Sequence, residues 1–416
     1  MKEHKVNIHE LIDGTMEALV GLGLSKHTVW GGYSDHYLPI GKFFKKSGLE
    51  HYDTDVLSGY IGMIERRLEN KEIGRDFFNQ SRKAVERLIE FYDTGKLNWT
   101  CRPRLSKFQI SAHFESVLDG FLAAEEFHHN TRGDFIWVVR KYLAFMQQDG
   151  HTCVNTIAAN DLQRFILFCA ERLAGGSLHN IVCYLKRFHH YLQETGQLRI
   201  DYKSLLSFPI IRDHKIQPYL TWDEITRTME QIDRSTDMGK RDYAMVLIGV
   251  RTGLRAIDIV YLRLKDIDWR TGTMRVLQQK TGDSLVLPLM ADVGEALKEY
   301  ILKARPVCES EYIFVRTKAP HQRLGDGAPI GDMFDSYQKK AGIERKAFDG
   351  KGFHALRRSI GRNMAITGVP VTTIAQVLGQ NTMNAAKKYI SLDSENLKIC
   401  ALDFRGIEVE RGEMPV

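Results

Sequence analysis

The sequence predicts a multidomain protein in which two all-α helical modules precede a mixed α+β, mainly helical domain with a small antiparallel β-hairpin or sheet. The length of 416 residues suggests two or three domains, at roughly 100 to 200 residues per domain. Only 10 residues are proline, below the usual share of roughly 5%, which favours long helices. Segments with β-type patterning occur only in the second half of the chain.

A weak internal repeat supports the two helical modules. Phe43–Gly48 matches Phe145–Gly150, and Thr94–Leu97 matches Thr195–Leu198. Apolar residues recur in each unit at spacings of three and four, as expected for helices that bury one face. One such stripe consists of Val182, Leu185, Phe188 and Leu192. Chance similarity between amphipathic helices is the alternative explanation for the repeat.

The repeat and the prolines together set the expected domain boundaries. We expect a first helical module of the SAM-like type over residues 1–105 and a second over residues 106–206. Residues 207–219 lack helical periodicity and contain two prolines, so this segment is predicted to be an extended linker. Thr221 and Glu224, three residues apart, then form a capping box that predicts the first helix of a new domain.

The new domain is expected to contain the β-structure. Two short β-type runs, Met274–Leu277 and Leu285–Leu289, flank a turn that contains Lys280 and therefore predict a β-hairpin. Helical patterning resumes after it. We assign residues 220–404 to this mixed domain and residues 405–416 to a C-terminal tail.

Composition excludes several classes of protein. Hydrophobic residues make up 43% and charged residues 26% of the chain, which argues against collagen and low-complexity sequences. Because no apolar run approaches the roughly 18 residues of a membrane span and no signal-peptide core follows the first residues, we expect a cytoplasmic protein. The six cysteines lie far apart without a C-x-x-C pair, so they predict neither a zinc site nor a disulfide framework.

The charge distribution is compatible with a polyanionic partner. The net charge is +6, and residues 339–403 contain eleven Lys or Arg against five Asp or Glu. A second stretch, residues 94–114, contains no acidic residue. Two basic surfaces are therefore predicted, with ordinary solvated faces as the alternative.

Two features of the mixed domain could place cations near a substrate. A predicted helix breaks at Gly253, and Arg255 and Asp258 follow at a spacing that lets the carboxylate orient the guanidinium. Lys280 lies at the predicted hairpin tip, where a mobile ammonium can reach a neighbouring groove. A surface ion pair and an ordinary turn lysine are the structural alternatives.

Three further features follow along the chain. His354 and Arg357 share one helix face, and Leu378-Gly379-Gln380 is expected to end a helix. Tyr389 comes nine residues after Gln380. A tyrosine at the edge of a core is the alternative to a nucleophile.

Together, the order Arg, Lys, His-x-x-Arg, Leu-Gly-x, Tyr at these intervals resembles the catalytic domain of the tyrosine recombinases, the phage integrase family. The resemblance covers about Thr221 to Asp403, and the preceding helical unit is similar to the core-binding domain of that family. It implies the corresponding fold and activity for residues 220–404.

The resemblance also implies roles for individual residues. The two catalytic arginines of the family fall on Arg255 and Arg357, its lysine on Lys280, its histidine on His354 and its nucleophile on Tyr389. One position departs from the pattern. Gln380 stands where the family usually has His or Trp, and an amide can donate a hydrogen bond but cannot shuttle a proton.

The chemistry of these residue types supports the match independently. Two guanidinium groups can bind the charge that develops on the non-bridging oxygens of a phosphodiester under attack. Tyr389 is a poor nucleophile until a base such as His354 removes its proton, and Lys280 could protonate the leaving 5′-oxygen. This set requires no metal or other cofactor, and the sequence contains no P-loop, no H-E-x-x-H motif and no carboxylate cluster suited to Mg²⁺.

The implied function is that of a site-specific DNA recombinase or integrase, of the kind carried by mobile genetic elements for integration, excision or transposition. The resemblance implies a 3′-phosphotyrosyl intermediate, double-stranded DNA as the partner, a dimer on one site and a tetramer in a Holliday-junction synapse, with accessory proteins as further partners. A type IB topoisomerase and a catalytically silent DNA-binding protein are the alternatives.

Basic residues outside the implied catalytic set are the expected DNA contacts. Those at one helix end of the first module and in the acid-free stretch would meet phosphates between the two modules, and the others surround the catalytic set. The expected contacts are Lys42, Lys45, Lys46, Arg102, Arg104, Lys107, Arg358, Lys387 and Lys388.

Overall fold

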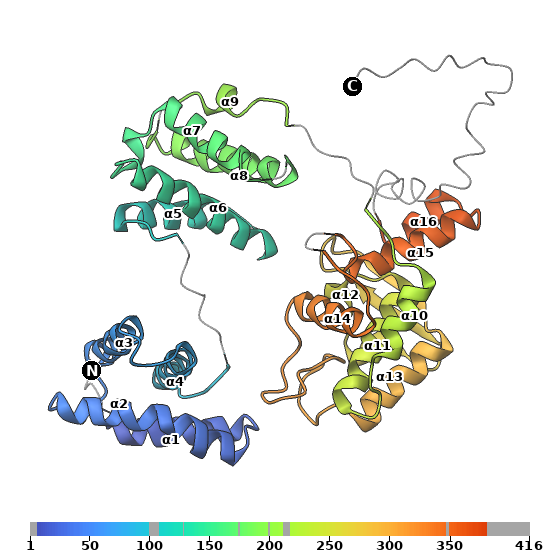
Figure 1. Ribbon diagram of the computed structural model, residues 1–416, viewed down its shortest axis with the longest axis horizontal. Helices are drawn as coiled ribbons and strands as arrows, with labels where there is room; N and C mark the ends of the chain where they lie inside the picture. Colours follow the sequence, from blue (N-terminus) through green and yellow to red (C-terminus); the bar gives the residue numbers. More distant parts are fainter. Residues whose placement is uncertain are drawn as a thin grey trace. The chain divides into compact units, whose positions relative to one another are not determined.

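The computed structural model of the protein is mainly helical, and its described residues include a three-stranded antiparallel sheet (Figure 1). Contacts divide the chain into two compact units, one formed by residues 101–215 and the other by residues 1–100 together with 216–416. No described helix is long and apolar enough to cross a lipid bilayer. The structure describes residues 6–99, 108–127, 129–173, 175–198, 200–210, 217–346 and 349–380.

Residues 6–99 form helices around their own hydrophobic cluster, which includes Leu19, Ile40, Phe44 and Leu88. The Asp53 carboxylate caps α3 (Thr54–Glu69) by accepting hydrogen bonds from the backbone N–H groups of Asp55 and Val56. The elements are α1 Ile8–Gly21, the π-helix Thr28–Tyr33, α2 Ser34–Lys46, α3 Thr54–Glu69 and α4 Arg75–Thr94.

The unit of residues 101–215 has a second cluster, rich in aromatic rings. The stripe predicted on one face of a helix lies on α8, and all four of its side chains are buried there. This confirms the helical interpretation of that stretch. The elements are α5 Ala112–Ala124, α6 His129–Gln148, the 3₁₀ turn Val154–Thr156, α7 Ala159–Ala170, α8 Gly175–Glu194 and α9 Tyr202–Leu205.

The landmarks of the internal repeat fall at helix ends. Gly48 and Gly150 follow α2 and α6, and Gly95 and Gly196 follow α4 and α8. All four glycines have a positive φ, as is usual where a helix stops in the left-handed region. The repeat therefore marks shared helix stops, while the organisation into two separate modules stays a prediction.

A third cluster, formed by described residues between Leu220 and Leu356, is centred on α11, which packs against α13, α14 and α15 (Figure 1). The predicted capping box at Thr221 is present, because the Thr221 hydroxyl accepts from the Glu224 N–H while the Glu224 carboxylate accepts from the Thr221 N–H. The helices are α10 Trp222–Glu230, α11 Asp237–Thr252, α12 Ala256–Val260, α13 Ala291–Lys303, α14 Ala328–Lys340, α15 His354–Ile366 and α16 Val371–Val377, with a 3₁₀ turn at Leu264–Asp266.

The predicted hairpin is present as β2, Thr273–Leu277, and β3, Ser284–Pro288. Met274 pairs with Leu287, and Val276 with Leu285. The sheet also has a two-residue strand, β1 Ile267–Asp268, which pairs with β2. The sequence did not predict β1, because two residues are too few to show a period of alternation. Met274, Val276 and Leu287 are buried, so one face of the sheet covers the α11 cluster.

His189 lies on α8 in the core of the unit formed by residues 101–215. Its side chain is buried, and neither ring nitrogen has a hydrogen-bond partner among the described residues. The rings of Tyr142 and Tyr202 lie beside it, at centroid distances of 5.4 and 6.0 Å. Burial lowers the pKa of His189 from 6.5 to about 4, because the charged ring would lose its hydration.

We expect this histidine to destabilise the unit in acid. Between about pH 6.5 and 4 the unfolded chain binds a proton at His189 that the folded chain does not, so stability falls as the pH falls through this window. The full effect is about 3 kcal/mol, at 1.36 kcal/mol per pKa unit. His189→Phe keeps an aromatic ring in the core and should remove this component.

Urea unfolding of both proteins at pH 7 and pH 5 checks this expectation. The loss of stability between the two pH values should be smaller in His189→Phe than in the natural chain. An equal loss in both proteins would mean that His189 takes no part in it.

Candidate active site

Arg357, on the first turn of α15, joins two turns that are distant in the sequence. Its side chain is 2% exposed. Nη1 donates a hydrogen bond of 3.0 Å to the carbonyl oxygen of Gly253, and Nη2 donates to the carbonyl oxygen of Leu378. Arg357 therefore fixes the turn that precedes Arg255 and the turn that precedes Gln380 to the same helix.

Glycine is needed at the first of these turns. Gly253 ends α11 with φ +65°, a conformation that costs any residue with a Cβ atom. A Cβ atom here would lie 2.9 Å from the Leu378 side chain and 3.5 Å from the Arg357 Cα atom. The turn therefore approaches both α15 and the end of α16 closely.

Arg255 follows this turn as the N-cap residue of α12. Its guanidinium lies 3.5 Å from the Asp258 carboxylate, which is fully buried. The other oxygen of Asp258 accepts a hydrogen bond of 2.9 Å from the backbone N–H of Gln279. A single buried carboxylate thus orients Arg255 and holds the hairpin residue next to Lys280.

Lys280 lies in the β2–β3 turn with an exposed side chain. The turn is closed by a hydrogen bond from Gln278 N–H to the Asp283 carbonyl and by another from Gly282 N–H to the Gln278 carbonyl. The backbone position of Lys280 is thereby defined, while its side chain extends into solvent.

His354 is the first residue of α15 and has an exposed side chain. It precedes Arg357 by three residues, so both point from one face of the helix. Arg345 holds the loop before His354 through a bidentate pair with Asp349, with N to O distances of 2.7 and 2.9 Å. This pair keeps the pKa of Asp349 well below its usual range. Lys351 adds an ion pair of 2.6 Å to Glu224 on α10.

Gln380 follows the end of α16, and its side chain is partly buried. The Gln380 N–H donates to the Ala375 carbonyl and the Gly379 N–H to the Gln376 carbonyl, which ends the helix as the sequence predicts. The structure therefore groups Arg255, Arg357 and Gln380 around linked turns. Tyr389, Lys387 and Lys388 lie outside the described residues, so the position of the expected nucleophile relative to this group stays a prediction.

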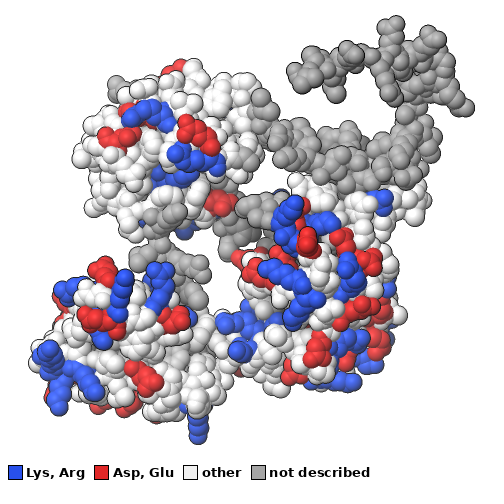
Figure 2. Space-filling view, in the orientation of Figure 1, with Lys and Arg blue, Asp and Glu red and all other residues white. Residues whose placement is uncertain are grey.

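The expected DNA contacts differ in their surroundings. Lys42, Lys45 and Lys46 are exposed at the end of α2, whereas Arg102, Arg104 and Lys107 lie outside the described residues. Lys and Arg side chains on the visible surface are interspersed with Asp and Glu (Figure 2).

Arg358 is 7% exposed. Its guanidinium donates to the carbonyl oxygens of Pro218 and Gly350. Arg358 therefore fixes the segment that precedes α10 to α15. No pattern in the sequence indicates this role. A contact between Arg358 and DNA stays a prediction, and it would require the guanidinium to share or leave these partners.

Two buried glutamines were also missed, because a glutamine in a turn or a helix carries no distinctive pattern. Gln278 is fully buried beneath the hairpin turn, and Gln338 is fully buried on α14, where it donates to the Lys351 carbonyl. Among the described residues, no group of three or more His, Cys, Asp or Glu side chains could hold a metal ion.

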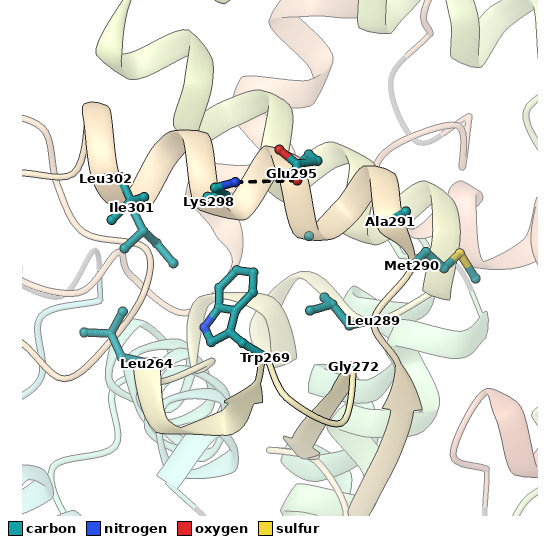
Figure 3. Close-up of a pocket in the computed structure, with 11 residues that line it drawn as sticks. Leu264, Trp269, Gly272, Leu289, Met290, Ala291, Glu295, Lys298, Ile301 and Leu302 are labelled. Carbon is teal, nitrogen blue, oxygen red and sulfur yellow. Dashed lines mark ion pairs between the residues drawn. The ribbon is translucent and has the colours of Figure 1, made fainter.

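An apolar groove of about 710 Å³ lies apart from these residues, between the β1–β2 turn and α13. Trp269 projects toward α13, where Glu295 and Lys298 form an ion pair of 3.8 Å (Figure 3). None of the predicted catalytic residues lines this groove.

Comparisons with known proteins identify the family of the chain and show a related fold. Residues 218–396 match the phage integrase family. A putative integrase/recombinase of Sinorhizobium fredii, y4gC, is 33% identical over 188 residues, which cover 45% of this chain and 95% of that protein. A second one, y4rA, is 32% identical over 272 residues, so that the alignment spans only 65% of its length and 65% of this chain.

The fold is similar to that of lambda integrase, solved as a tetramer bound to a Holliday junction. The TM-score is 0.52 at 18% sequence identity, and the alignment covers 82% of this chain and 91% of that one.

The double role of Arg357 as a bridge predicts a large loss of stability on truncation. Arg357→Ala leaves two buried carbonyl oxygens without these donors, at about 1 to 3 kcal/mol each. Arg251→Ala is a matched control, because Arg251 forms an exposed ion pair with Asp292 and such pairs contribute about 0 to 1 kcal/mol.

Urea unfolding followed by tryptophan fluorescence measures both variants. The urea midpoint of Arg357→Ala should lie well below that of the natural chain. If its decrease is as small as that of Arg251→Ala, the bridging role is contradicted.

Proposed function

The chain belongs to the phage integrase family, the tyrosine recombinases, and on this premise we propose that it is a site-specific DNA recombinase that cleaves and rejoins strands through a 3′-phosphotyrosyl intermediate. The observation that carries this proposal is the bridge from Arg357 to the turns of Arg255 and Gln380. It links the turns that precede Arg255 and Gln380 to the helix that carries Arg357, and so connects three separate stretches of sequence.

The two arginines would bind the phosphodiester. Charge grows on the non-bridging oxygens as the phosphorus is attacked, and guanidinium groups remain protonated at any physiological pH. Arg255 is held by the buried Asp258 carboxylate and Arg357 by backbone carbonyls, so both are positioned before the reaction. Phosphate binding by Arg357, which is 2% exposed, would require its guanidinium to share or leave these carbonyls, as at Arg358. The Gln380 amide would add one hydrogen bond to the same oxygens but no proton transfer.

Tyr389, Lys280 and His354 would carry the covalent step. The Tyr389 hydroxyl oxygen forms a bond to phosphorus, while the bond from phosphorus to the 5′-oxygen breaks and leaves its electron pair on that oxygen. His354 accepts the phenol proton, and Lys280 supplies a proton to the 5′-oxygen. A 5′-hydroxyl of a second strand can then attack the phosphotyrosine and reverse every transfer, so the exchange needs no external energy source.

The remaining parts of the chain would hold the DNA and the assembly. We propose that residues 1–105 and 106–206 are separate helical modules that bind DNA, with the exposed Lys42, Lys45 and Lys46 among the phosphate contacts. A dimer on one recombination site and a tetramer in synapsis are the expected assemblies, because lambda integrase is seen as a tetramer on a Holliday junction. Integration, excision or transposition of a mobile element is the proposed role.

The nucleophile assignment predicts that Tyr389→Phe abolishes covalent protein–DNA adducts. Duplex binding should stay within a few fold of that of the natural chain, because the variant loses one hydroxyl and keeps the basic surface. The protein is incubated with a library of genomic DNA fragments, denatured, and the attached DNA is sequenced, which also identifies the preferred site. An adduct formed by Tyr389→Phe would overturn the assignment.

The same site, once recovered, separates the candidate functions. Recombinant products from two short duplexes support the recombinase, whereas relaxation of supercoils without recombinants indicates a topoisomerase-like enzyme. Binding without any adduct indicates a catalytically silent protein.

The role of Lys280 as general acid predicts a rescue by chemistry. A substrate with sulfur in place of the bridging 5′-oxygen has a leaving group that departs without protonation, so it should restore cleavage by Lys280→Ala but not by Arg255→Ala. The rates of adduct formation on the oxygen and sulfur substrates measure this. If both variants fail equally on the sulfur substrate, Lys280 serves only to bind DNA.

A further inference from the structure

Gln278 has an unusual position for a polar turn residue, because its side chain is fully buried. It immediately follows β2, two residues before Lys280. Its Oε1 atom accepts a hydrogen bond of 3.1 Å from the Thr281 hydroxyl on the other side of Lys280. The side chain therefore fills the inside of the turn that presents the lysine.

The amide of Gln278 also packs directly against Gly379, a hundred residues further along the chain. A Cβ atom at position 379 would lie 2.0 Å from Nε2 and 2.6 Å from Cδ of Gln278, far inside contact distance. Gly379 has φ +56°, so glycine is favoured there both by the backbone and by the space that Gln278 takes. The lysine hairpin thus rests on the turn that leads to Gln380.

The hairpin has a second attachment, the hydrogen bond from Gln279 N–H to Asp258. Lys280 is thereby held between the Arg255 turn through Asp258 and the Gln380 turn through Gln278. Packing alone does not explain the choice of glutamine at this position. Its Nε2 donor has no hydrogen-bond partner among the described residues, and an apolar side chain would fill the space without that cost.

We propose that Gln278 is a positioning residue that couples the lysine hairpin to the Gly379–Gln380 turn, so that Lys280 and the phosphate-binding groups keep a fixed relation. The inference rests on the proposed function, because it assigns a purpose to the position of Lys280. A displacement of about 1 Å of a catalytic group can cost up to about a hundredfold in rate, so a loss of this support should be visible in the proton-transfer step.

The test compares Gln278→Ala with the natural chain on the recovered DNA site, prepared with either oxygen or sulfur at the bridging 5′ position. Adduct formation on the oxygen substrate should slow by about tenfold or more, because a displaced Lys280 protonates the leaving group poorly. The rate on the sulfur substrate should stay close to that of the natural chain. Equal slowing on both substrates, or no slowing on either, would overturn the proposal.

Two further variants separate positioning from general damage. Gln338→Ala removes another fully buried glutamine from the same part of the chain, and its ratio of oxygen to sulfur rates should equal that of the natural chain. Gln278→Met keeps the bulk of the side chain but loses the bond from Thr281, and it replaces the alanine variant if that one does not fold. It should show the same preference for the sulfur substrate.

Amide hydrogen exchange tests the coupling without any activity. In Gln278→Ala, exchange should accelerate at Gln279 and Gly282 in the hairpin and also at Gly379 and Gln380, whose N–H groups are hydrogen-bonded to α16. Acceleration confined to the hairpin would overturn the coupling. If the natural chain forms no adduct with any DNA, the proposed function fails, and hydrogen exchange alone then decides whether Gln278 links the two turns.

Discussion

The guanidinium of Arg357 is the constraint on which the arrangement of the site depends. Its hydrogen bonds to the Gly253 and Leu378 carbonyls connect the end of α11, the start of α15 and the end of α16. A buried charge is costly unless several polar groups compensate it, and the open ends of two helices provide carbonyl groups that their own helices leave unused. The hydrogen bonds that compensate the buried charge of Arg357 therefore also position the turns that precede Arg255 and Gln380.

The candidate site contains buried residues that position other groups and exposed residues whose side chains extend into solvent. Asp258, Gln278 and Arg357 are buried and have defined backbone or side-chain partners, whereas Lys280 and His354 are exposed and occupy defined backbone positions. A proton donor or acceptor has to follow its substrate, while groups that bind a developing charge work best when they are organised in advance. In the proposed mechanism, the exposed Lys280 and His354 would transfer protons and the buried Arg357 would bind the developing charge, so the burial of these three residues matches their proposed roles.

The apolar groove differs from the candidate site in the kind of side chains that line it. The groove beside Trp269 is lined mostly by aliphatic and aromatic side chains, with one exposed ion pair at its edge. Compared with this groove, the predicted catalytic residues include fewer apolar side chains and more hydrogen-bond donors, and the guanidinium groups of Arg255 and Arg357 are held in place. For a polyanionic substrate, the direction and charge of donors matter more than the volume of a cavity.

Sequence patterns were enough to predict which residue types would carry the proposed chemistry and to predict much of the local structure. Spacing within one helix places His354 and Arg357 on the same face, the β-type runs around Lys280 give the hairpin, and the Thr221 capping box starts a helix, because each of these depends on neighbours in the sequence. The tertiary structure alone decided that Arg357 bridges two turns, that Arg358 is buried against Pro218, and that Gln278 packs on Gly379. These contacts join residues separated by about twenty to more than a hundred positions, and each depends on how helix ends meet after the core has packed. A pattern of neighbouring residues therefore contains no signal for them.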